Sequence, residues 1–306
     1  MISVAMTTYN GARYLKEQLD SILTQTEEDF ELIICDDCSS DDTIKILSEY
    51  AKNDSRIHFF KNEENLGFTK NFEKVISKCN GNYIALSDQD DIWLPNHLSI
   101  LLNFLKAGDY SLVGGNALLV DSDNNDFGCK FINNSNLPEK REDFEKMILY
   151  RNVFQGAALL FDKEILKKAL PFPDNMKYHD WWLALIASEI KGIGYIDEPV
   201  LRYRQHGNNV TGMHEKDSFK SKIKKYFSFD LEETGLRNLN VLSKFESISN
   251  KKEKVRDALE FANACKNLTF RAFKYFKKHQ KDIYYGESIF RRIIRSTKIF
   301  INVIIH

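Results

Sequence analysis

The sequence YIALSDQDD, residues 83–91, places three carboxylates directly after a short apolar run. A similar arrangement occurs twice earlier in the chain, as ISVAMTTYN at residues 2–10 and FELIICDDCSSDD at residues 30–42. Short apolar runs that end in polar clusters are typical of buried strands followed by loops. The three stretches therefore predict strands at residues 2–7, 30–35 and 83–87, each with polar side chains at its carboxyl end.

Helical patterns separate these strands. These helical patterns cover residues 12–25, a segment that is capped by Ser40 or Asp41, and residues 69–78. A further strand is predicted at residues 57–61. Strands that alternate with helices predict βαβ units, and so an α/β fold with a mainly parallel, Rossmann-like sheet flanked by helices. Ligands of such sheets bind beyond the carboxyl ends of the strands, so the three polar clusters are expected to converge on one site. A G-x-G-x-x-G fingerprint is missing, which argues against a dinucleotide cofactor.

The pattern becomes mixed after Trp93. The expected elements are a helix at 94–105, a strand at 111–120, a polar loop at 121–136, a strand at 153–161, helices at 163–169 and 179–190, and a strand at 200–204. Beyond residue 214 only helical patterns occur. We therefore expect an α/β domain over residues 1–214 and a helical C-terminal region over residues 215–306.

Charge is distributed unevenly between these two parts. Residues 1–214 carry a net charge of −11 and residues 215–306 a net charge of +10. This asymmetry indicates a cation site in the first part and an anionic partner for the second. Basic and bulky apolar residues mix at helical spacing in 222–227 and 289–300, as in helices that lie on an anionic membrane. A packing helix or a dimer interface stays an equal alternative, and nucleic acid is not expected because no recognised binding motif accompanies the charge.

The N-terminal residues show neither a basic start nor a long apolar run, and no stretch reaches the roughly 18 to 20 apolar residues of a membrane span. The five cysteines are an odd number without a framework of spacings, as expected of reduced thiols. The expected location is cytoplasmic, with peripheral contact at the inner face of the plasma membrane as a further option.

Asp88, Asp90 and Asp91 lie within four residues of one another. Carboxylates packed this closely repel one another unless a positive charge lies between them. Hard oxygen ligands select Mg²⁺ or Mn²⁺, which bind through one or two carboxylates and the phosphates of a substrate. The alternative is that these acids only cap the following helix.

Several motifs together resemble the inverting GT-A glycosyltransferases of family 2. They are Thr8-Tyr9-Asn10, Asp36-Asp37 with Ser40-Asp41-Asp42-Thr43, Asn65-Leu66-Gly67 with Asn71, Gly81-Asn82-Tyr83-Ile84 and Asp88-Gln89-Asp90-Asp91. The resemblance spans nearly all of residues 1–214 and implies a GT-A fold. It also implies a nucleotide site made by Thr8, Tyr9, Asp37, Lys70 and Asp88, in which Tyr9 stacks on a pyrimidine base and Asp37 accepts its imide N–H.

The same resemblance assigns Asp88 and Asp90 as ligands of Mn²⁺ or Mg²⁺, with His206 as a third ligand. Asp180, in the segment Lys177-Tyr178-His179-Asp180-Trp181-Trp182, resembles the family's general base, and Trp181 and Trp182 would contact the acceptor sugar. Alternatively, Asp180 is a helix N-cap and both tryptophans are core residues. Arg202 or Arg204 would pair with the diphosphate, or with acidic residues of the body, and Asp91 extends the acidic signature toward acceptor or phosphate.

Segments 154–161, 179–182 and 203–208 look most like the rhamnosyltransferase branch of the family. This resemblance implies transfer of L-rhamnose from dTDP-rhamnose to a glycan or a lipid-linked glycan during synthesis of bacterial surface polysaccharides. A UDP-glucose or UDP-galactose transferase and a catalytically inactive nucleotide-sugar or glycan-binding relative are the alternatives. A sugar-nucleotide pyrophosphorylase is not favoured, because its glycine-rich, arginine-containing N-terminal loop is absent.

Overall fold

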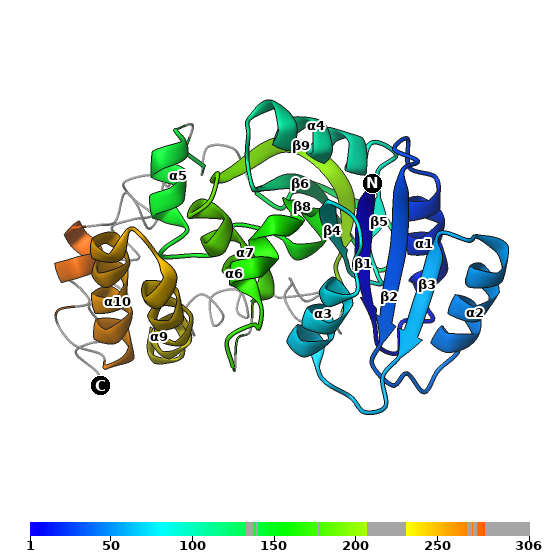
Figure 1. Ribbon diagram of the computed structural model, residues 1–306, viewed down its shortest axis with the longest axis horizontal. Coiled ribbons are helices and arrows are strands. Elements are labelled where there is room, and N and C mark those ends of the chain that lie inside the picture. The colour runs from blue at the N-terminus through cyan, green and yellow to red at the C-terminus, as the bar shows by residue number, and fades with distance from the viewer. Residues whose placement is uncertain are drawn as a thin grey trace. The chain divides into compact units, whose positions relative to one another are not determined.

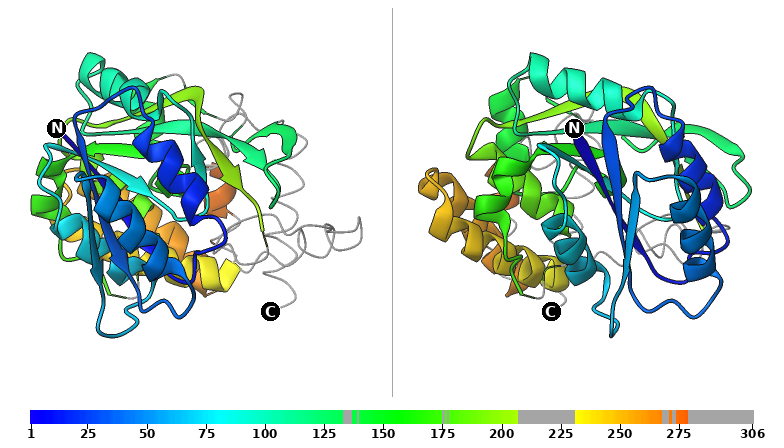
Figure 2. Two further views of the ribbon diagram at one scale, coloured as in Figure 1. Left: turned by 90° about the vertical axis from the view of Figure 1, so that its right-hand side faces the viewer. Right: turned by 45° about the vertical axis from the view of Figure 1, so that its right-hand side comes forward.

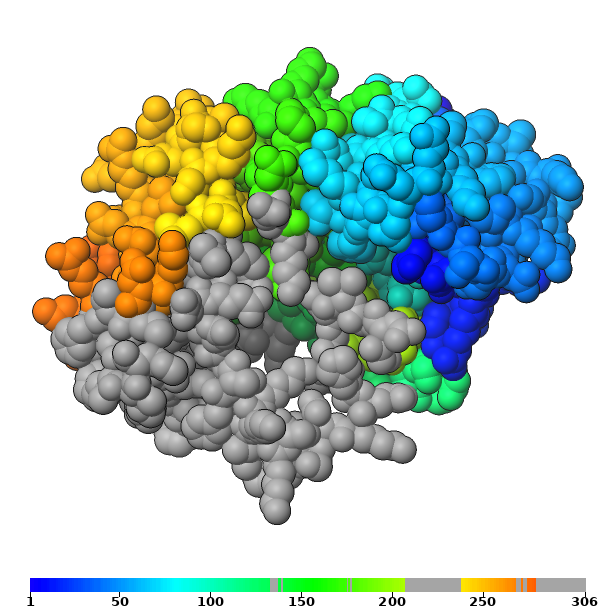
Figure 3. Space-filling model, turned by 90° about the horizontal axis from the view of Figure 1, so that it is seen from below, coloured from blue at the N-terminus to red at the C-terminus, as the bar shows by residue number. Residues whose placement is uncertain are grey.

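The computed structural model (Figures 1 and 2) describes residues 1–132, 137–138, 140–174, 176, 178–206, 231–267, 271 and 274–278. Residues outside these ranges are grey in the space-filling view of Figure 3. The chain folds into two compact units. The first comprises residues 1–132, 154–172 and 178–205, and the second comprises residues 133–153, 173–177 and 206–306. The domain boundary predicted at residue 214 lies outside the described residues and stays a prediction.

A nine-stranded sheet runs through the first unit (Figure 2). Its order is β3-β2-β1-β4-β8-β6-β9-β5, and β7 pairs with β6 outside this path. The strands are β1 (Ile2–Thr8), β2 (Phe30–Asp36), β3 (Ile57–Lys61), β4 (Tyr83–Ser87), β5 (Ile92–Trp93), β6 (Leu112–Val120), β7 (Asp126–Lys130), β8 (Leu159–Asp162) and β9 (Ile193–Arg204). The four strands β3-β2-β1-β4 are parallel, whereas β8 pairs antiparallel with both β4 and β6.

Helices cover both faces of this sheet (Figures 1 and 2). Those of the first unit are α1 (Leu15–Leu23), α2 (Thr43–Asn53), α3 (Phe68–Ser77), α4 (His97–Ala107), α6 (Leu166–Ala169) and α7 (His179–Ser188), with 3₁₀ turns η2 (Gly156–Ala158) and η3 (Lys163–Ile165). Side chains of α1, α2 and α4 share one core cluster, and α3 packs against β1 and β2 from the other face. All seven residues of β1 are buried, as expected of a strand that is covered on both faces.

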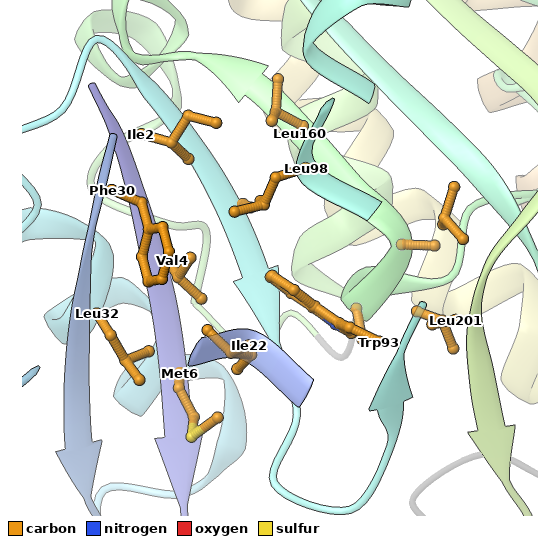
Figure 4. Close-up of a cluster of buried hydrophobic side chains, with 14 of the residues drawn as sticks. Ile2, Val4, Met6, Ile22, Phe30, Leu32, Trp93, Leu98, Leu160 and Leu201 are labelled. Carbon is orange, nitrogen blue, oxygen red and sulfur yellow. The ribbon is translucent and has the colours of Figure 1, made fainter. Parts of the chain in front are cut away.

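The core cluster connects the parallel strands to the mixed part of the sheet. Figure 4 shows side chains of β1, β2, α1, α4, β5, β8 and β9 meeting there: Ile2, Val4, Met6, Phe30, Leu32, Ile22, Leu98, Trp93, Leu160 and Leu201. Every second residue of β1 points into the cluster, which is the alternation of a strand. Burial of each such side chain contributes about 1.5–3 kcal/mol, so the platform that carries the strand ends is firmly held.

The described part of the second unit contains turns and short connecting segments together with three helices that Figure 1 labels. They are α5 (Arg141–Met147), α9 (Leu231–Ile248) and α10 (Lys252–Lys266). Helices α9 and α10 pack against each other, and Leu242, Phe245, Val255 and Ala258 are buried. The helical character predicted for the C-terminal region is confirmed for these residues. Among the helices of the described residues, none combines the length and the apolar character needed to span a membrane.

The α/β fold with a parallel sheet core is confirmed, and β3 and β4 match their predicted bounds. Two predictions for the mixed part are wrong. The predicted polar loop 121–136 contains strand β7, whose five residues are all exposed and so leave no alternation of buried and exposed side chains. The predicted strand 153–161 forms a strand only from Leu159, because residues 156–158 form a 3₁₀ turn.

Other elements of the mixed part differ in extent. Strand β9 begins at Ile193 rather than at residue 200, although Pro199 lies within it. A proline cannot donate a ladder hydrogen bond, and the register between β6 and β9 shifts on both sides of Asn116, which is paired with Pro199. The short strand β5 and helix α5 were not predicted.

Candidate functional site

Three strand ends that lie side by side form the candidate site. Strand β1 lies between β2 and β4, with Thr8 opposite Asp36 and Met6 opposite Ser87. From β1 the chain continues to β2 and β3 on one side and returns to β4 on the other. Open α/β sheets bind ligands at such a switch point, so the residues that follow these strands lie at the candidate ligand-binding edge.

Tyr9 follows β1 and is held by its backbone. Its N–H donates to Oε1 of Gln89 at 2.8 Å, and Nε2 of Gln89 donates to its carbonyl oxygen at 3.0 Å. The residue is 51% exposed, an unusual state for a large aromatic residue. The ring is therefore available to stack on a nucleobase, which is the predicted role. Gln89 was not predicted as a site residue, although it lies inside the acidic motif.

Asp37 follows β2 and is only 3% exposed. Its carboxylate accepts hydrogen bonds from Nδ2 of Asn62 at 2.8 Å, from the N–H of Leu66 at 2.8 Å and from the N–H of Gly67 at 2.9 Å. Gly67 has a φ of +77°, a conformation that favours glycine, and this geometry lets the loop wrap around Asp37. These bonds fix the orientation of the carboxylate, and its predicted contact with the base stays a prediction.

Thr8 and Lys70, the other predicted nucleotide contacts of this region, have partners within the protein. Oγ1 of Thr8 donates to Oδ2 of Asp36 at 2.8 Å, and the same carboxylate receives both the N–H and the hydroxyl of Ser39. Lys70 lies on α3 and forms an ion pair with Glu73 at 3.1 Å. Asp36 thus holds the end of β2 to Thr8 and Ser39 by hydrogen bonds. The sequence alone does not show this structural role.

The acids after β4 repel one another. Asp88 is half-buried, and burial together with the nearby carboxylates of Asp90 and Asp180 raises its pKa to about 8. Asp91 is fully buried, and burial with the charges of Asp90 and Asp88 raises its pKa well above the ordinary value. The Asp91 carboxylate accepts from the N–H of Arg204 at 3.1 Å and from Nε2 of Gln155 at 3.5 Å. The negative potential at this strand end favours either protons or a cation.

A divalent cation fits this cluster chemically. Asp88 and Asp90 supply hard oxygen atoms, and a cation between them would relieve the repulsion that raises the pKa of Asp88. Within the described ranges, no group of three or more His, Cys, Asp or Glu residues is arranged to hold a metal ion. Mg²⁺ commonly uses one or two carboxylates and completes its shell with substrate phosphates, so a pair suffices for an ion that binds together with a nucleotide diphosphate. The third predicted ligand, His206, is half-buried and belongs to the second unit, and its role stays a prediction.

Asp180 lies in the first turn of α7 and is 8% exposed. Its Oδ1 accepts the N–H of Trp181 at 2.8 Å, and its charge contributes to the raised pKa of Asp88. A Cβ atom on Gly156 would lie 3.9 Å from Cβ of Asp180, and Gln155 donates to Asp91 at 3.5 Å, so Asp180 and the acids after β4 adjoin the same two residues. Trp181 and Trp182 are buried, and the indole N–H of Trp182 donates to the carbonyl of Ala169 at 2.8 Å. The predicted acceptor contacts of both tryptophans stay predictions, and their burial matches the alternative that they are core residues.

Arg202 and Arg204 donate hydrogen bonds within the protein. Nη1 of Arg202 donates to Oδ1 of Asn124 at 2.9 Å. Arg204 is 1% exposed, and its guanidinium donates to the carbonyl oxygens of Asp90 and Ser122 and pairs with Glu17 at 2.5 Å. The hydrogen bonds of Arg204 therefore hold the loop that carries Asp90 in place. A contact of either arginine with a diphosphate stays a prediction.

Two buried polar side chains beside Asp180 were not predicted as site residues. Both ring nitrogens of His179 and Oε1 of Gln155 have no hydrogen-bond partner in the described part of the chain. His179 was named only as a neighbour of Asp180, and Gln155 only as part of a motif. The spacing of these residues in the sequence does not identify them as site residues. These atoms lack hydrogen-bond partners among the described residues only because the fold buries them away from water.

A model of the family described as "Glycosyl transferase family 2" matches residues 3–169. The chain is 31% identical to the dTDP-rhamnosyl transferase RfbG of Shigella flexneri over 72% of this chain and 77% of that protein. It is 28% identical to the UDP-Glc:alpha-D-GlcNAc-diphosphoundecaprenol beta-1,3-glucosyltransferase WfgD of Escherichia coli over 63% of this chain and 73% of that protein.

Solved structures share the fold at low sequence identity. TarS 1-349 of S. aureus in complex with UDP-GlcNAc superposes with a TM-score of 0.64 at 17% identity, covering 92% of this chain and 78% of that chain. The mannosyltransferase PcManGT of Pyrobaculum calidifontis in complex with GDP-Man and Mn²⁺ gives a TM-score of 0.53 at 15% identity, covering 99% of this chain and 86% of that chain. The predicted GT-A fold class is confirmed by these similarities.

Proposed function

The chain belongs to glycosyl transferase family 2, and from this premise we propose that it is a metal-dependent, inverting enzyme that transfers a hexose from a nucleotide diphosphate to a glycan hydroxyl. One observation carries the proposal. A Cβ atom on Gly156 would lie 3.9 Å from Cβ of Asp180, and the neighbouring Gln155 donates to Asp91 at 3.5 Å, which supports a candidate base close to the acids after β4. A catalytic centre for this reaction needs both groups within reach of one sugar carbon.

Each residue of the site has a proposed task. The exposed ring of Tyr9 stacks on a pyrimidine, and the fixed carboxylate of Asp37 accepts the imide N–H of the base. Asp180 takes the proton from the acceptor hydroxyl while that oxygen attacks the anomeric carbon, and the bond to the diphosphate oxygen breaks on the opposite face. This in-line displacement inverts the configuration of the sugar.

Asp88 and Asp90 would hold the Mn²⁺ or Mg²⁺ ion. Such an ion, when bound, neutralises the charge that develops on the departing nucleotide diphosphate. Arg204 donates to the carbonyl of Asp90, and Gln89 fixes the same loop to the β1 end, so both residues hold the acids in position. We propose positioning roles for them here, and diphosphate contact by Arg202 as a further proposal.

For the donor, we propose dTDP-L-rhamnose, supported by the similarity to a relative whose name gives that activity. A UDP-hexose is the alternative, supported by the glucosyltransferase relative, and a catalytically inactive relative is the second alternative. The proposed acceptor is a glycan or a lipid-linked glycan in bacterial surface polysaccharide synthesis. The basic region 215–306 would bind the anionic membrane surface that carries such acceptors.

Titration calorimetry tests the central claim. UDP and dTDP are titrated into the protein with and without Mn²⁺, and into the Asp90→Asn variant. We expect the ion to increase nucleotide affinity in the natural protein and to have little effect in the variant. Nucleotide binding that is indifferent to the ion in both proteins would refute metal dependence.

A turnover screen tests the donor. dTDP-rhamnose, UDP-glucose and UDP-galactose are each incubated with the enzyme, and release of the nucleotide diphosphate is followed. Release from dTDP-rhamnose supports the rhamnosyl proposal, whereas consumption of a UDP-hexose alone rejects it. An inactive relative would release no nucleotide from any donor.

A further inference from the structure

Helix α1 carries a glutamine on its buried face. Gln18 is fully buried, and the other buried residues of this helix are Leu15, Leu19 and Ile22. A buried amide costs free energy unless its hydrogen bonds are made, so an apolar side chain would be the simpler occupant of this place. The presence of a glutamine here is therefore explained by the hydrogen bonds that it makes rather than by packing.

Gln18 is hydrogen-bonded to the start of the acidic segment, residues 87–93, which carries the acids after β4. Its Nε2 donates to Oγ of Ser87 at 2.8 Å, and the Ser87 hydroxyl donates to the carbonyl oxygen of Asp88 at 3.0 Å. Ser87 is the last residue of β4 and is fully buried. Because the Ser87 oxygen accepts from Gln18, its own proton is directed at Asp88, and these two bonds together orient the peptide plane between Asp88 and Gln89.

The same turn of α1 holds the other end of the acidic segment. The Ser21 hydroxyl donates to the carbonyl oxygen of Gln18 at 2.8 Å and also lies 3.1 Å from its Oε1. Oγ of Ser21 accepts the N–H of Trp93 at 3.0 Å, where α1 packs against β5. One turn of a helix thus fixes both ends of the segment whose carboxylates are the candidate metal ligands.

We propose that Gln18 is a positioning residue, which holds the acidic segment in the geometry that lets Asp88 and Asp90 bind a divalent cation. This inference rests on the proposed function of the same site and adds to it a residue that touches neither the ion nor the nucleotide. Carboxylates that repel one another tend to move apart unless the backbone that bears them is restrained. A restrained pair is ready for the ion, and loss of a group that orients metal ligands commonly lowers metal affinity about 10–100-fold.

The test separates the ion from the nucleotide. Calorimetry measures the affinities for dTDP and for UDP, each with and without Mn²⁺, in the natural protein and in Gln18→Met. Methionine has a similar length but cannot form the hydrogen bonds of the amide. We expect the gain in nucleotide affinity that Mn²⁺ provides to fall about tenfold, while the affinity without the ion stays within about twofold. A role of Gln18 in packing alone would not change the ion-dependent part.

Ser87→Ala interrupts the same chain of hydrogen bonds at its second member. The substitution removes the donor to the carbonyl oxygen of Asp88 and the acceptor of Gln18. It deletes one oxygen atom and adds no bulk, so it tests the proposal even if Gln18→Met does not fold. The gain in nucleotide affinity from Mn²⁺ should again fall about tenfold.

Gln25→Met is the matched control on the same helix. Gln25 is also buried, and its amide donates to the carbonyl oxygens of Ser21 and Leu94 and accepts the N–H of Leu98. None of these three bonds reaches the acidic segment. Urea denaturation should therefore show at least as large a loss of stability as in Gln18→Met, whereas the effect of Mn²⁺ on nucleotide affinity should be unchanged.

The outcomes distinguish this inference from the proposed function. An undiminished effect of Mn²⁺ in a folded Gln18→Met or Ser87→Ala protein overturns the inference, while metal-assisted binding by the natural protein stands. An equal loss of affinity with and without the ion also overturns it, as does the same loss of the ion effect in Gln25→Met, because either result indicates a general loosening of the fold. If Mn²⁺ does not raise the affinity of the natural protein, the proposed metal dependence fails and the inference fails with it.

Discussion

The two halves of the sheet contribute different parts of the site. The parallel half, β3-β2-β1-β4, carries Tyr9, Asp37 and Asp88 on regular strand ends. The mixed half, with β8, β6 and β9, and the adjoining α7 supply Arg204 and Asp180. In the proposed mechanism, the regular half binds the nucleotide, and Asp180 beside the irregular half acts in the transfer step. Substitutions in the two halves should therefore alter different measurements.

Asp180→Asn should have the largest effect. Removal of the proposed base from the mixed half is expected to lower kcat by about 10²–10⁴-fold, the usual contribution of general acid–base catalysis. Binding of dTDP or UDP in the presence of Mn²⁺ should be retained, as calorimetry can check. Retained turnover would show that Asp180 is not the general base. A loss of nucleotide binding would show that the mixed half also contributes to binding the nucleotide.

Arg204→Met should mainly reduce the stability of the folded protein, with a smaller effect on binding of the nucleotide diphosphate. The substitution leaves the carbonyl oxygens of Asp90 and Ser122 without their donor and leaves Glu17 without its ion pair. We expect the free energy of unfolding to fall by about 2–3 kcal/mol, as measured by urea denaturation. Arg13→Met is a suitable control, because its pair with Asp123 is exposed and 3.9 Å long. A stable Arg204→Met protein with weakened diphosphate binding would favour the phosphate role instead.

Tyr9→Ala should weaken nucleotide binding and leave the transfer step largely unchanged. Stacking of a base on an aromatic ring contributes about 1–3 kcal/mol, so the Kd for dTDP or UDP should rise at least about fivefold. The kcat at saturating donor should change little, which a full kinetic analysis can determine. Phe60→Ala, which removes another exposed ring, serves as the control and should leave the Kd unchanged. An unaffected Kd in Tyr9→Ala would exclude stacking on this ring.

The pH dependence of stability should reflect the raised pKa of Asp88. Asp88 has a pKa of about 8 in the folded protein and about 3.9 in the unfolded chain, so the folded state holds a proton that the unfolded state has lost between these values. The free energy of unfolding of the ion-free protein should therefore contain a contribution that decreases as pH rises from about 4 to 8. Asp91 contributes in the same direction. Melting curves of Asp88→Asn should show a shallower decline, and an identical slope would contradict the raised pKa.

The sequence predicts the parallel half better than the mixed half for a physical reason. Strands β1, β2 and β4 are buried on both faces and bounded by polar clusters, so local composition identifies them. Strand β7 is exposed along its whole length and depends on pairing with β6, and β9 passes through Pro199 by a shift of register. Elements stabilised by partners distant in sequence leave a weak local signal.

The site follows the same division. The acids after β2 and β4 were predicted because each cluster is continuous in the sequence. The contribution of Asp180 to the potential at Asp88 depends on how α7 lies against the sheet, which local patterns do not specify. The unpartnered nitrogens of His179 likewise arise from contacts with Phe72 on α3, far away in the sequence.

Gln89 ties the loop that bears the acids to the loop that presents Tyr9, through both ends of one amide. The ring proposed to stack on the base and the acids proposed to hold the cation are restrained together in this way, so ordering either one lowers the entropic cost of ordering the other. Linkage between two such equilibria is reciprocal. Pyrimidine and metal should consequently bind with positive cooperativity, and this amide would transmit it.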